Sequence, residues 1–207
     1  PTTCEQLGQC VKKLYDNGIP MTVRGAGTNL SGGVIPDAPD TVVILTNGLN
    51  RILEINENDL YAVVEPGVIT AQFAAAVEKK GLFYPPDPGS QSVSTNGVTK
   101  DYVMGVEFFD ATGEVVKSGS RTVKCVTGYN LAGMLTQSEG TLGVISQAIL
   151  KLVPPPKASK ALMAVFDDMQ KAAEAVAGII AAHVVPCTLE FLDNNTIVRV
   201  DDFTHAG

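Results

Sequence analysis

Hydrophobic residues follow two different spacings along this chain, and together the spacings predict a mixed α+β fold. Apolar residues three and four positions apart predict a helix that is capped by Thr2 or Thr3 and ends near Asn17. Further helices are expected over residues 71–80, capped by Thr70, and over residues 131–135. Short apolar runs bounded by turn residues predict strands over residues 19–23, 42–45, 52–55, 61–65, 103–109, 114–117 and 144–152.

Three consecutive prolines at 154–156 predict a domain boundary, because prolines stiffen an extended connector. Beyond them the pattern predicts a strand over 161–166, a helix over 169–182, a strand over 187–192 and a helix from Asp193 or Asn194 to Phe203. This βαβα piece has few neighbours with which to bury a two-sided sheet. We therefore expect a first domain over 1–153, with α+β subdomains of about 1–68 and 69–153, and the truncated start of a second domain over 157–207.

Composition and charge narrow the classes of function. The 207 residues carry 22 acidic and 15 basic side chains, and the net charge of −7 disfavours nucleic acid as a partner. No apolar run approaches the ~20 residues of a membrane span, and no secretion signal is visible, so we expect a cytoplasmic protein. The four cysteines form no C-x-x-C pair and the two histidines lie outside any cluster, so no metal site is expected in these residues.

The stretch from Thr22 to Gly33 carries a chemical signal of its own, because a predicted strand opens there into a glycine-rich loop. Glycines let successive backbone N–H groups turn inward and form a concave nest for phosphate oxygens. Further donors come from the Thr28 and Ser31 hydroxyls and the Arg24 guanidinium. The loop lacks the lysine of a P-loop, and Leu30 stands where a Rossmann fingerprint needs glycine. Taken alone, the loop fits both a phosphate site and a glycine-rich surface turn.

Four segments, in order, resemble FAD-linked oxidases with the p-cresol methylhydroxylase or vanillyl-alcohol oxidase type of flavin domain (PCMH-type). Residues 23–33 resemble the pyrophosphate loop of that family, and residues 65–68 resemble the turn that passes the cofactor. Residues 84–90, stiffened by three prolines, resemble the loop beside the isoalloxazine ring. Residues 137–145 resemble the adenine-side segment. Within the family, the chain most resembles the glycolate oxidase flavin subunit and FAD-dependent D-lactate and D-2-hydroxyglutarate dehydrogenases.

The resemblance implies a fold, a cofactor and a set of binding residues. The expected fold is a two-subdomain PCMH-type FAD-binding domain followed by the truncated start of an α+β, ferredoxin-like cap. Thr28 stands where relatives with covalent flavin often carry histidine, so FAD is expected to be non-covalent. A metal is expected only in the missing cap region. The residues expected to bind FAD are Arg24, Gly25, Ala26, Gly27, Thr28, Asn29, Leu30, Ser31, Pro66, Gly67, Pro88, Ser90, Ser94, Thr95, Glu139, Gly140, Gly143, Val144 and Ile145.

The resemblance also implies an activity, oxidation of a D-2-hydroxy acid such as glycolate or D-lactate by hydride transfer to FAD. Electrons would leave to an acceptor, which can be a partner protein subunit. The catalytic base belongs to the missing cap, so none is assigned and the fragment alone is expected to be inactive. Three alternatives remain: another flavin enzyme of the same fold, a flavin-binding or electron-transfer module, and a phosphate-binding domain without flavin.

One departure from the family concerns the residues near Asn96. A glycine- and asparagine-rich stretch that usually lines the flavin ring is absent between Thr95 and Gly97. It is either deleted or omitted from this sequence, and we favour omission. Omission predicts a chain break between Ser94 and Val98.

Overall fold

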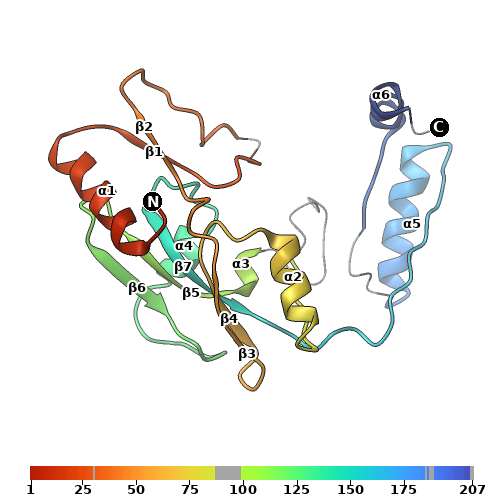
Figure 1. Cartoon of the computed structure of the whole chain (residues 1–207). Helices are drawn as coiled ribbons and strands as arrows, with labels where there is room; N and C mark the ends of the chain where they lie inside the picture. Colours follow the sequence, from red (N-terminus) through yellow and green to blue (C-terminus); the bar gives the residue numbers. More distant parts are fainter. Residues whose placement is uncertain (30, 87–98, 185, 187–188, 206–207) are drawn as a thin grey trace. The chain divides into compact units, whose positions relative to one another are not determined.

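The computed structural model describes residues 1–29, 31–86, 99–184, 186 and 189–205, and these residues fall into two compact units (Figure 1). The first unit comprises residues 1–86 and 99–155, and the second includes the described residues from 156 onward. The first unit contains nearly all of the buried core.

A five-stranded antiparallel sheet forms the centre of the first unit (Figure 1). Its order is β3-β4-β7-β5-β6, so the last strand of the unit lies between two strands that precede it in sequence. A separate pair of parallel strands, β1 and β2, lies earlier in the chain. The strands are β1 (Met21–Arg24), β2 (Val42–Leu45), β3 (Ile52–Asn56), β4 (Tyr61–Val64), β5 (Val103–Phe109), β6 (Val115–Gly119) and β7 (Val144–Lys151).

Helix α1 (Cys4–Asp16) begins where the Thr3 side chain accepts a hydrogen bond from the backbone N–H of Gln6. Its buried face, Leu7, Val11 and Leu14, packs with residues of β2, β5 and β7. A Cβ at Gly8 would overlap the ring of Phe109, so glycine allows the close approach of helix and sheet. Helix α1 is therefore anchored to both sheets of the unit.

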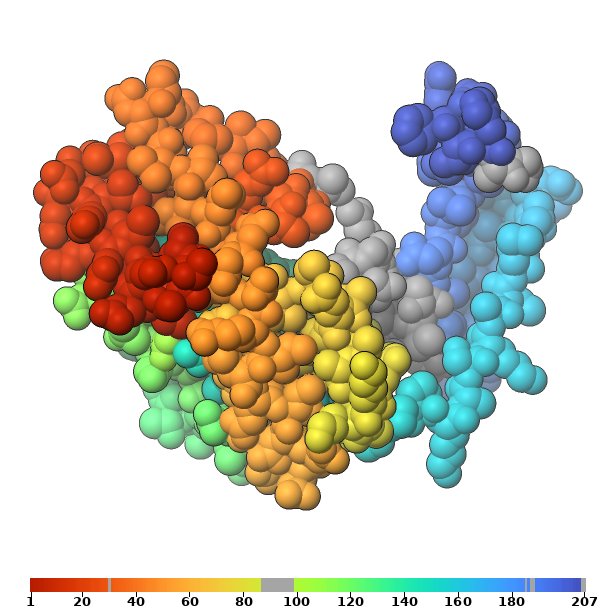
Figure 2. Space-filling view, in the orientation of Figure 1, coloured from red at the N-terminus to blue at the C-terminus, as the bar shows by residue number. Residues whose placement is uncertain are grey.

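Helix α2 (Thr70–Glu78) buries Phe73 and Val77 in a cluster with residues of β4 and β7. It lies directly against the β3–β4 hairpin in the space-filling view (Figure 2). The expected cap at Thr70 is wrong, because Ile69 takes the N-cap position and no side chain caps the helix. The short helices α3 (Thr99–Tyr102) and α4 (Leu131–Leu135) complete the unit, and α4 packs on β5.

The second unit contains helices α5 (Met169–Ala181) and α6 (Asn194–Thr204), each capped by the aspartate that precedes it. The strands expected over 161–166 and 187–192 are wrong where the structure describes these residues, since they are not paired in a sheet. A strand needs a neighbour for its backbone groups, and Leu162, Met163 and Val165 are about nine-tenths exposed. The mixed helix and sheet architecture expected for the chain is confirmed.

Candidate functional site

The glycine-rich loop begins where strand β1 ends. Strands β1 and β2 run parallel with Arg24 opposite Leu45, and the Thr46 N–H donates to the Arg24 carbonyl at 3.0 Å. Gly27 has a φ of +75°, and a Cβ there would lie 2.8 Å from Nε and Nη2 of Arg24. The guanidinium therefore lies over the backbone of Gly27, an approach that only glycine permits without rearrangement.

Arg24 is an exposed cation beside this backbone. Among the ion pairs of the described residues, none involves Arg24. Ala26 and Thr28 are exposed as well, while Gly25 and Asn29 are half-buried. The loop thus presents an unpaired guanidinium and an exposed hydroxyl next to a left-handed glycine, a combination suited to an anion.

Glu139 reaches this loop from a segment 110 residues away. Its carboxylate accepts hydrogen bonds from Asn29 Nδ2 at 3.1 Å and from the Ser31 hydroxyl. These bonds, first that of Ser31 and then that of Asn29, hold the pKa of Glu139 below its ordinary value, with a contribution from the backbone N–H of Gly33. The glycine-rich loop and the 137–145 segment are therefore in contact.

Two glycines near Glu139 allow the 137–145 segment to pack closely against strands β1 and β5. A Cβ on Gly140 would lie 3.0 Å from Cβ of Val23, and a Cβ on Gly143 would lie 2.6 Å from the Phe108 ring. Val144 is buried in the core with helix α1, and Ile145 packs against the cluster around α4. The Val144 side chain is therefore unavailable to a ligand, while that of Ile145 is half-buried.

The turn at Glu65, Pro66 and Gly67 packs near the start of the glycine-rich loop. The Gly67 N–H donates to the Leu49 carbonyl at 2.7 Å, and a Cβ on Gly67 would overlap the Thr46 carbonyl oxygen. Thr46 is in turn hydrogen-bonded to Arg24. The turn therefore packs on the residues that follow β2, next to the glycine loop.

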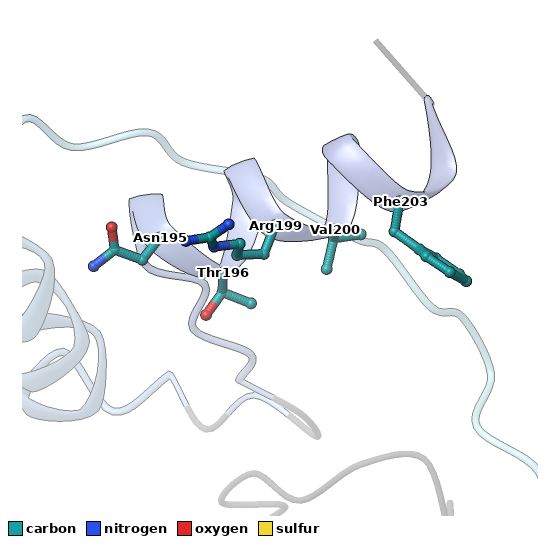
Figure 3. Close-up of a pocket in the computed structure, with 5 residues that line it drawn as sticks. All are labelled: Asn195, Thr196, Arg199, Val200 and Phe203. Atoms are coloured by element: carbon teal, nitrogen blue, oxygen red, sulfur yellow. The ribbon is translucent and has the colours of Figure 1, made fainter.

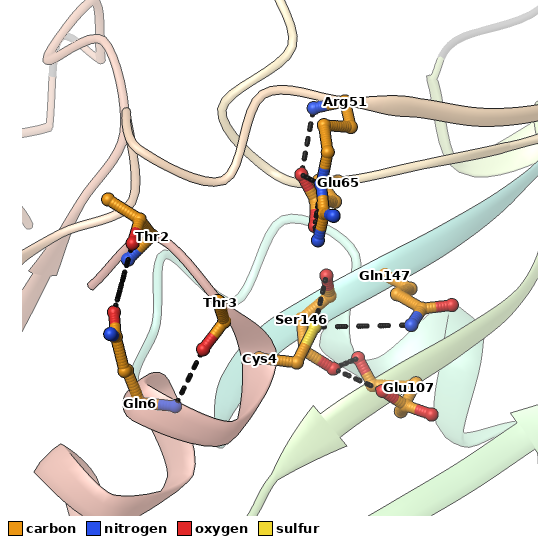
Figure 4. A network of polar contacts seen from close by, with 9 residues as sticks. All are labelled: Thr2, Thr3, Cys4, Gln6, Arg51, Glu65, Glu107, Ser146 and Gln147. Atoms are coloured by element: carbon orange, nitrogen blue, oxygen red, sulfur yellow. Dashed lines mark hydrogen bonds and ion pairs between the residues drawn. The ribbon is translucent and has the colours of Figure 1, made fainter.

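An ion pair with Arg51 holds Glu65 at the start of this turn (Figure 4). The Glu65 side chain is fully buried, and it accepts from Arg51 Nη2 at 2.7 Å and from the Arg51 backbone N–H at 2.8 Å. Burial alone would raise the pKa of Glu65, but the hydrogen bonds from Arg51 outweigh burial and lower it. Arg51 was not predicted from the sequence; it lies directly before β3, and its carbonyl accepts from the Glu65 N–H at 3.0 Å, which places the two residues opposite each other.

A second polar network ties helix α1 to the sheet (Figure 4). The hydroxyl of the fully buried Ser146 donates to the side chain of Glu107 at 2.9 Å. The Cys4 thiol lies 3.8 Å from the Ser146 carbonyl oxygen, and Gln147 Nε2 lies 3.9 Å from the Cys4 sulfur. These contacts satisfy polar groups between α1, β5 and β7, and we assign them a structural role.

In the third expected segment, residues 84–90, the described side chains belong to the core and its edge. Tyr84 is a core residue, with its ring edge-on to Phe73 at 5.0 Å and to Tyr102 at 6.2 Å, and burial raises its pKa to about 12. Of the expected binding residues, Leu30, Pro88, Ser90, Ser94 and Thr95 lie outside the described residues. The chain break expected between Ser94 and Val98 lies outside them too.

Two observations test whether a dinucleotide fits these residues. The Arg24 cation and the Gly27 backbone suit a diphosphate. Asn29 Oδ1 is buried and has no hydrogen-bond partner among the described residues, so it can accept from a ribose or ribityl hydroxyl. The residues present therefore fit a ligand with both a diphosphate and hydroxyl groups.

Other features add little to this site. A hollow along α6 is lined by residues of that helix alone (Figure 3): Asn195, Thr196, Arg199, Val200 and Phe203. Within the described residues, no group of three or more His, Cys, Asp or Glu side chains lies close enough together to hold a metal ion. In the same ranges, no helix is both long and apolar enough to cross a membrane.

Comparison with known protein families gives two matches. Residues 1–119 match a family described as FAD binding domain. Residues 155–206 match one described as FAD linked oxidases, C-terminal domain.

Comparison with individual proteins gives relatives along the whole chain. Glycolate oxidase subunit GlcD of Bacillus subtilis is 41% identical over 100% of this chain and 47% of its own length. D-lactate dehydrogenase of Anaerostipes hadrus is 32% identical over 98% of this chain and 46% of its own length. The chain thus spans about half the length of these relatives. A structure of alkyldihydroxyacetonephosphate synthase, 21% identical, superposes with a TM-score of 0.72 over 91% of this chain and 37% of its own.

Proposed function

Because this chain belongs to the family described as FAD binding domain, whose match covers residues 1–119, we propose that the protein oxidises a D-2-hydroxy acid with non-covalently bound FAD. The observation that supports the cofactor site is the meeting of the glycine loop, the Glu65–Gly67 turn and Glu139 in one unit. These segments are far apart in sequence, so a chance surface turn at Gly25–Gly33 does not account for their meeting.

The binding roles follow from the geometry of the loop. Arg24 and the backbone around Gly27 hold the diphosphate, since a planar cation and inward N–H groups match its oxygens. Asn29 Oδ1 accepts from a hydroxyl of the ligand, which relieves its lack of a partner. Gly67, Gly140 and Gly143 have no side chain and the side chain of Val144 is buried, so these residues contribute backbone groups. FAD itself supplies the hydride acceptor.

The substrate class rests on the relatives. One relative is a glycolate oxidase subunit and another is a D-lactate dehydrogenase, and glycolate and D-lactate are both small 2-hydroxy acids. Hydride transfer from such a substrate also needs a base for its hydroxyl proton, within hydrogen-bond reach. His183 and His205 are exposed at helix ends in the second unit and are not proposed as that base. The base remains unassigned.

The electron-accepting partner and the cellular location are also proposals, supported by one relative and by the composition. One relative is described as a subunit, which supports a protein partner that takes electrons from the flavin. The net charge of −7 does not favour nucleic acid, and we propose a cytoplasmic location. A flavin-binding or electron-transfer module without substrate chemistry is the alternative that the unassigned base keeps open.

Two measurements on the full-length protein test the proposal. The purified protein should be yellow, with flavin released by acid, which separates non-covalent from covalent FAD. D-lactate, glycolate and D-2-hydroxyglutarate should be offered anaerobically, with L-lactate as the control for stereochemistry. Bleaching of the flavin absorbance by a D-hydroxy acid supports the proposal. Bound FAD that none of these acids bleaches would favour the electron-transfer module, and absence of FAD binding would reject both.

A further inference from the structure

The carboxylate of Glu139 already occupies donors of the loop to which we assign the diphosphate. We propose that Glu139 is a built-in anion that holds these donors until the cofactor's diphosphate displaces it, so that Glu139 sets the affinity and rate of cofactor loading. This inference rests on the proposed diphosphate role of the loop.

The contacts of Glu139 are those that a phosphate oxygen would make. Its two oxygens accept from the Ser31 hydroxyl and from Asn29 Nδ2, which are both loop residues. A Cβ on Gly33 would overlap Oε2 of Glu139, so the carboxylate lies directly against the loop backbone. Carboxylates and phosphates use the same hydroxyl, amide and backbone N–H donors. An anion at this place and a bound diphosphate therefore compete for them.

The backbone of Glu139 is fixed while its side chain is free to leave. The turn is closed by hydrogen bonds from the Thr141 N–H, at 3.0 Å, and the Thr141 hydroxyl, at 2.6 Å, to the Ser138 carbonyl. Gly140 packs on Val23 beside the loop. Glu139 has a φ of +54°, an uncommon conformation for a residue other than glycine. Because the side chain is exposed, rotation about its own bonds releases the loop donors without unfolding the turn.

Arg24 remains available while Glu139 is in place. It forms no ion pair among the described residues, so the Glu139 carboxylate does not neutralise it. An incoming diphosphate can therefore meet Arg24 first and then take the donors of Asn29, Ser31 and Gly33 from Glu139. If the Glu139 carboxylate occupies the loop donors in about nine of every ten molecules, the apparent affinity for the cofactor is about tenfold weaker than that of a loop with free donors.

The test uses the full-length apoprotein and the variant Glu139→Gln, which keeps the size of the side chain but removes its charge. Glu78→Gln on α2 is the control, since it makes the same charge change at an exposed site away from the loop. Calorimetry with FAD, ADP and inorganic pyrophosphate gives the affinities, and stopped-flow fluorescence with FAD gives the association rate. Thermal melting of each variant confirms that it is folded.

Competition predicts that Glu139→Gln tightens the binding of all three ligands by about tenfold and speeds FAD association, while Glu78→Gln changes neither. Unchanged affinity in Glu139→Gln would overturn the inference and leave the diphosphate loop standing. Weaker FAD binding with unchanged pyrophosphate binding would also overturn it, since Glu139 would then contact another part of the cofactor. Failure of wild type and variants alike to bind FAD and pyrophosphate would reject the proposed loop function and this inference with it.

Discussion

The substitution Gly27→Ala tests the glycine loop at the point where glycine is required. The new Cβ would lie 2.8 Å from Nε and Nη2 and 3.1 Å from Cζ of Arg24, so the guanidinium must move. Gly27 also has a φ of +75°, and a left-handed residue with a Cβ costs roughly 1–2 kcal/mol. The variant therefore combines a general strain on folding with a specific displacement of Arg24.

The two effects are separable because the chain offers a matched control. Gly81, at the end of α2, has a φ of +72°, and a Cβ there would meet nothing within 4 Å. Gly81→Ala therefore carries the backbone strain without the displacement. Both variants should lose roughly 1–2 kcal/mol of unfolding free energy in urea titrations.

Only Gly27→Ala should weaken ligand binding. Loss of a charge-assisted hydrogen bond from Arg24 costs about 1.5–3 kcal/mol, which corresponds to about a 10- to 150-fold weaker affinity. Calorimetry of the full-length apoprotein with pyrophosphate and with FAD measures this directly. Unchanged affinity in Gly27→Ala, with the expected loss of stability, would refute the assignment of Arg24 and the loop to the diphosphate. Equal weakening in Gly81→Ala would show that the effect is global.

Further predictions concern the fold and the activity. Arg51→Ala leaves the buried Glu65 carboxylate without its partner and should lower the midpoint of a urea titration at neutral pH. Because the pKa of Glu65 is lowered in the folded state, the ionised carboxylate stabilises the fold at pH values above its ordinary pKa of 4.5, and this stabilisation is lost as the pH falls below that value. Arg51→Ala should therefore weaken the dependence of the unfolding free energy on pH in the acid range. An unchanged dependence would contradict the pairing. Gly8→Ala should destabilise the protein by about 1–3 kcal/mol, despite the better helix propensity of alanine, because its Cβ overlaps the Phe109 ring; a higher melting temperature would contradict this packing. The 207-residue chain alone, given FAD and a dye acceptor, should not oxidise D-lactate, and steady dye reduction would show that the catalytic groups lie within it.

Local signals in the sequence predicted the elements that depend on local interactions. Helix α4 and strand β2 have the expected bounds, and Thr3 caps α1 as its side-chain chemistry favours. The strand expected over 161–166 failed because an apolar run forms a strand only when another strand pairs with it. An apolar run therefore indicates only a tendency to form a strand, and the strand forms where a neighbouring strand is present to pair with it.

In the candidate site, too, the sequence predicted the feature that depends on neighbouring residues and missed the contacts between distant ones. The glycine loop was recognisable from its residues, because nests for anions need glycines and donors close together in sequence. The contact of Glu139 with Asn29 and Ser31 joins positions more than a hundred residues apart, and no periodicity predicts it. The resemblance to a family placed both segments near one cofactor, but it did not indicate that the glutamate would bind the loop itself. Arg51 was missed because a lone arginine directly before a strand has no distinctive pattern.

The strand order of the central sheet has a consequence for synthesis of the protein. Strand β7, the last of its unit, lies between β4 and β5, so neither has its inner neighbour until residues 144–151 have left the ribosome. Until then, the nascent chain carries two strand edges with unpaired backbone groups, which are prone to pairing with other chains. The sheet therefore assembles after translation of the domain is nearly complete. A nascent chain that stalls before β7 should be bound by chaperones, whereas one that stalls beyond it should resist proteolysis.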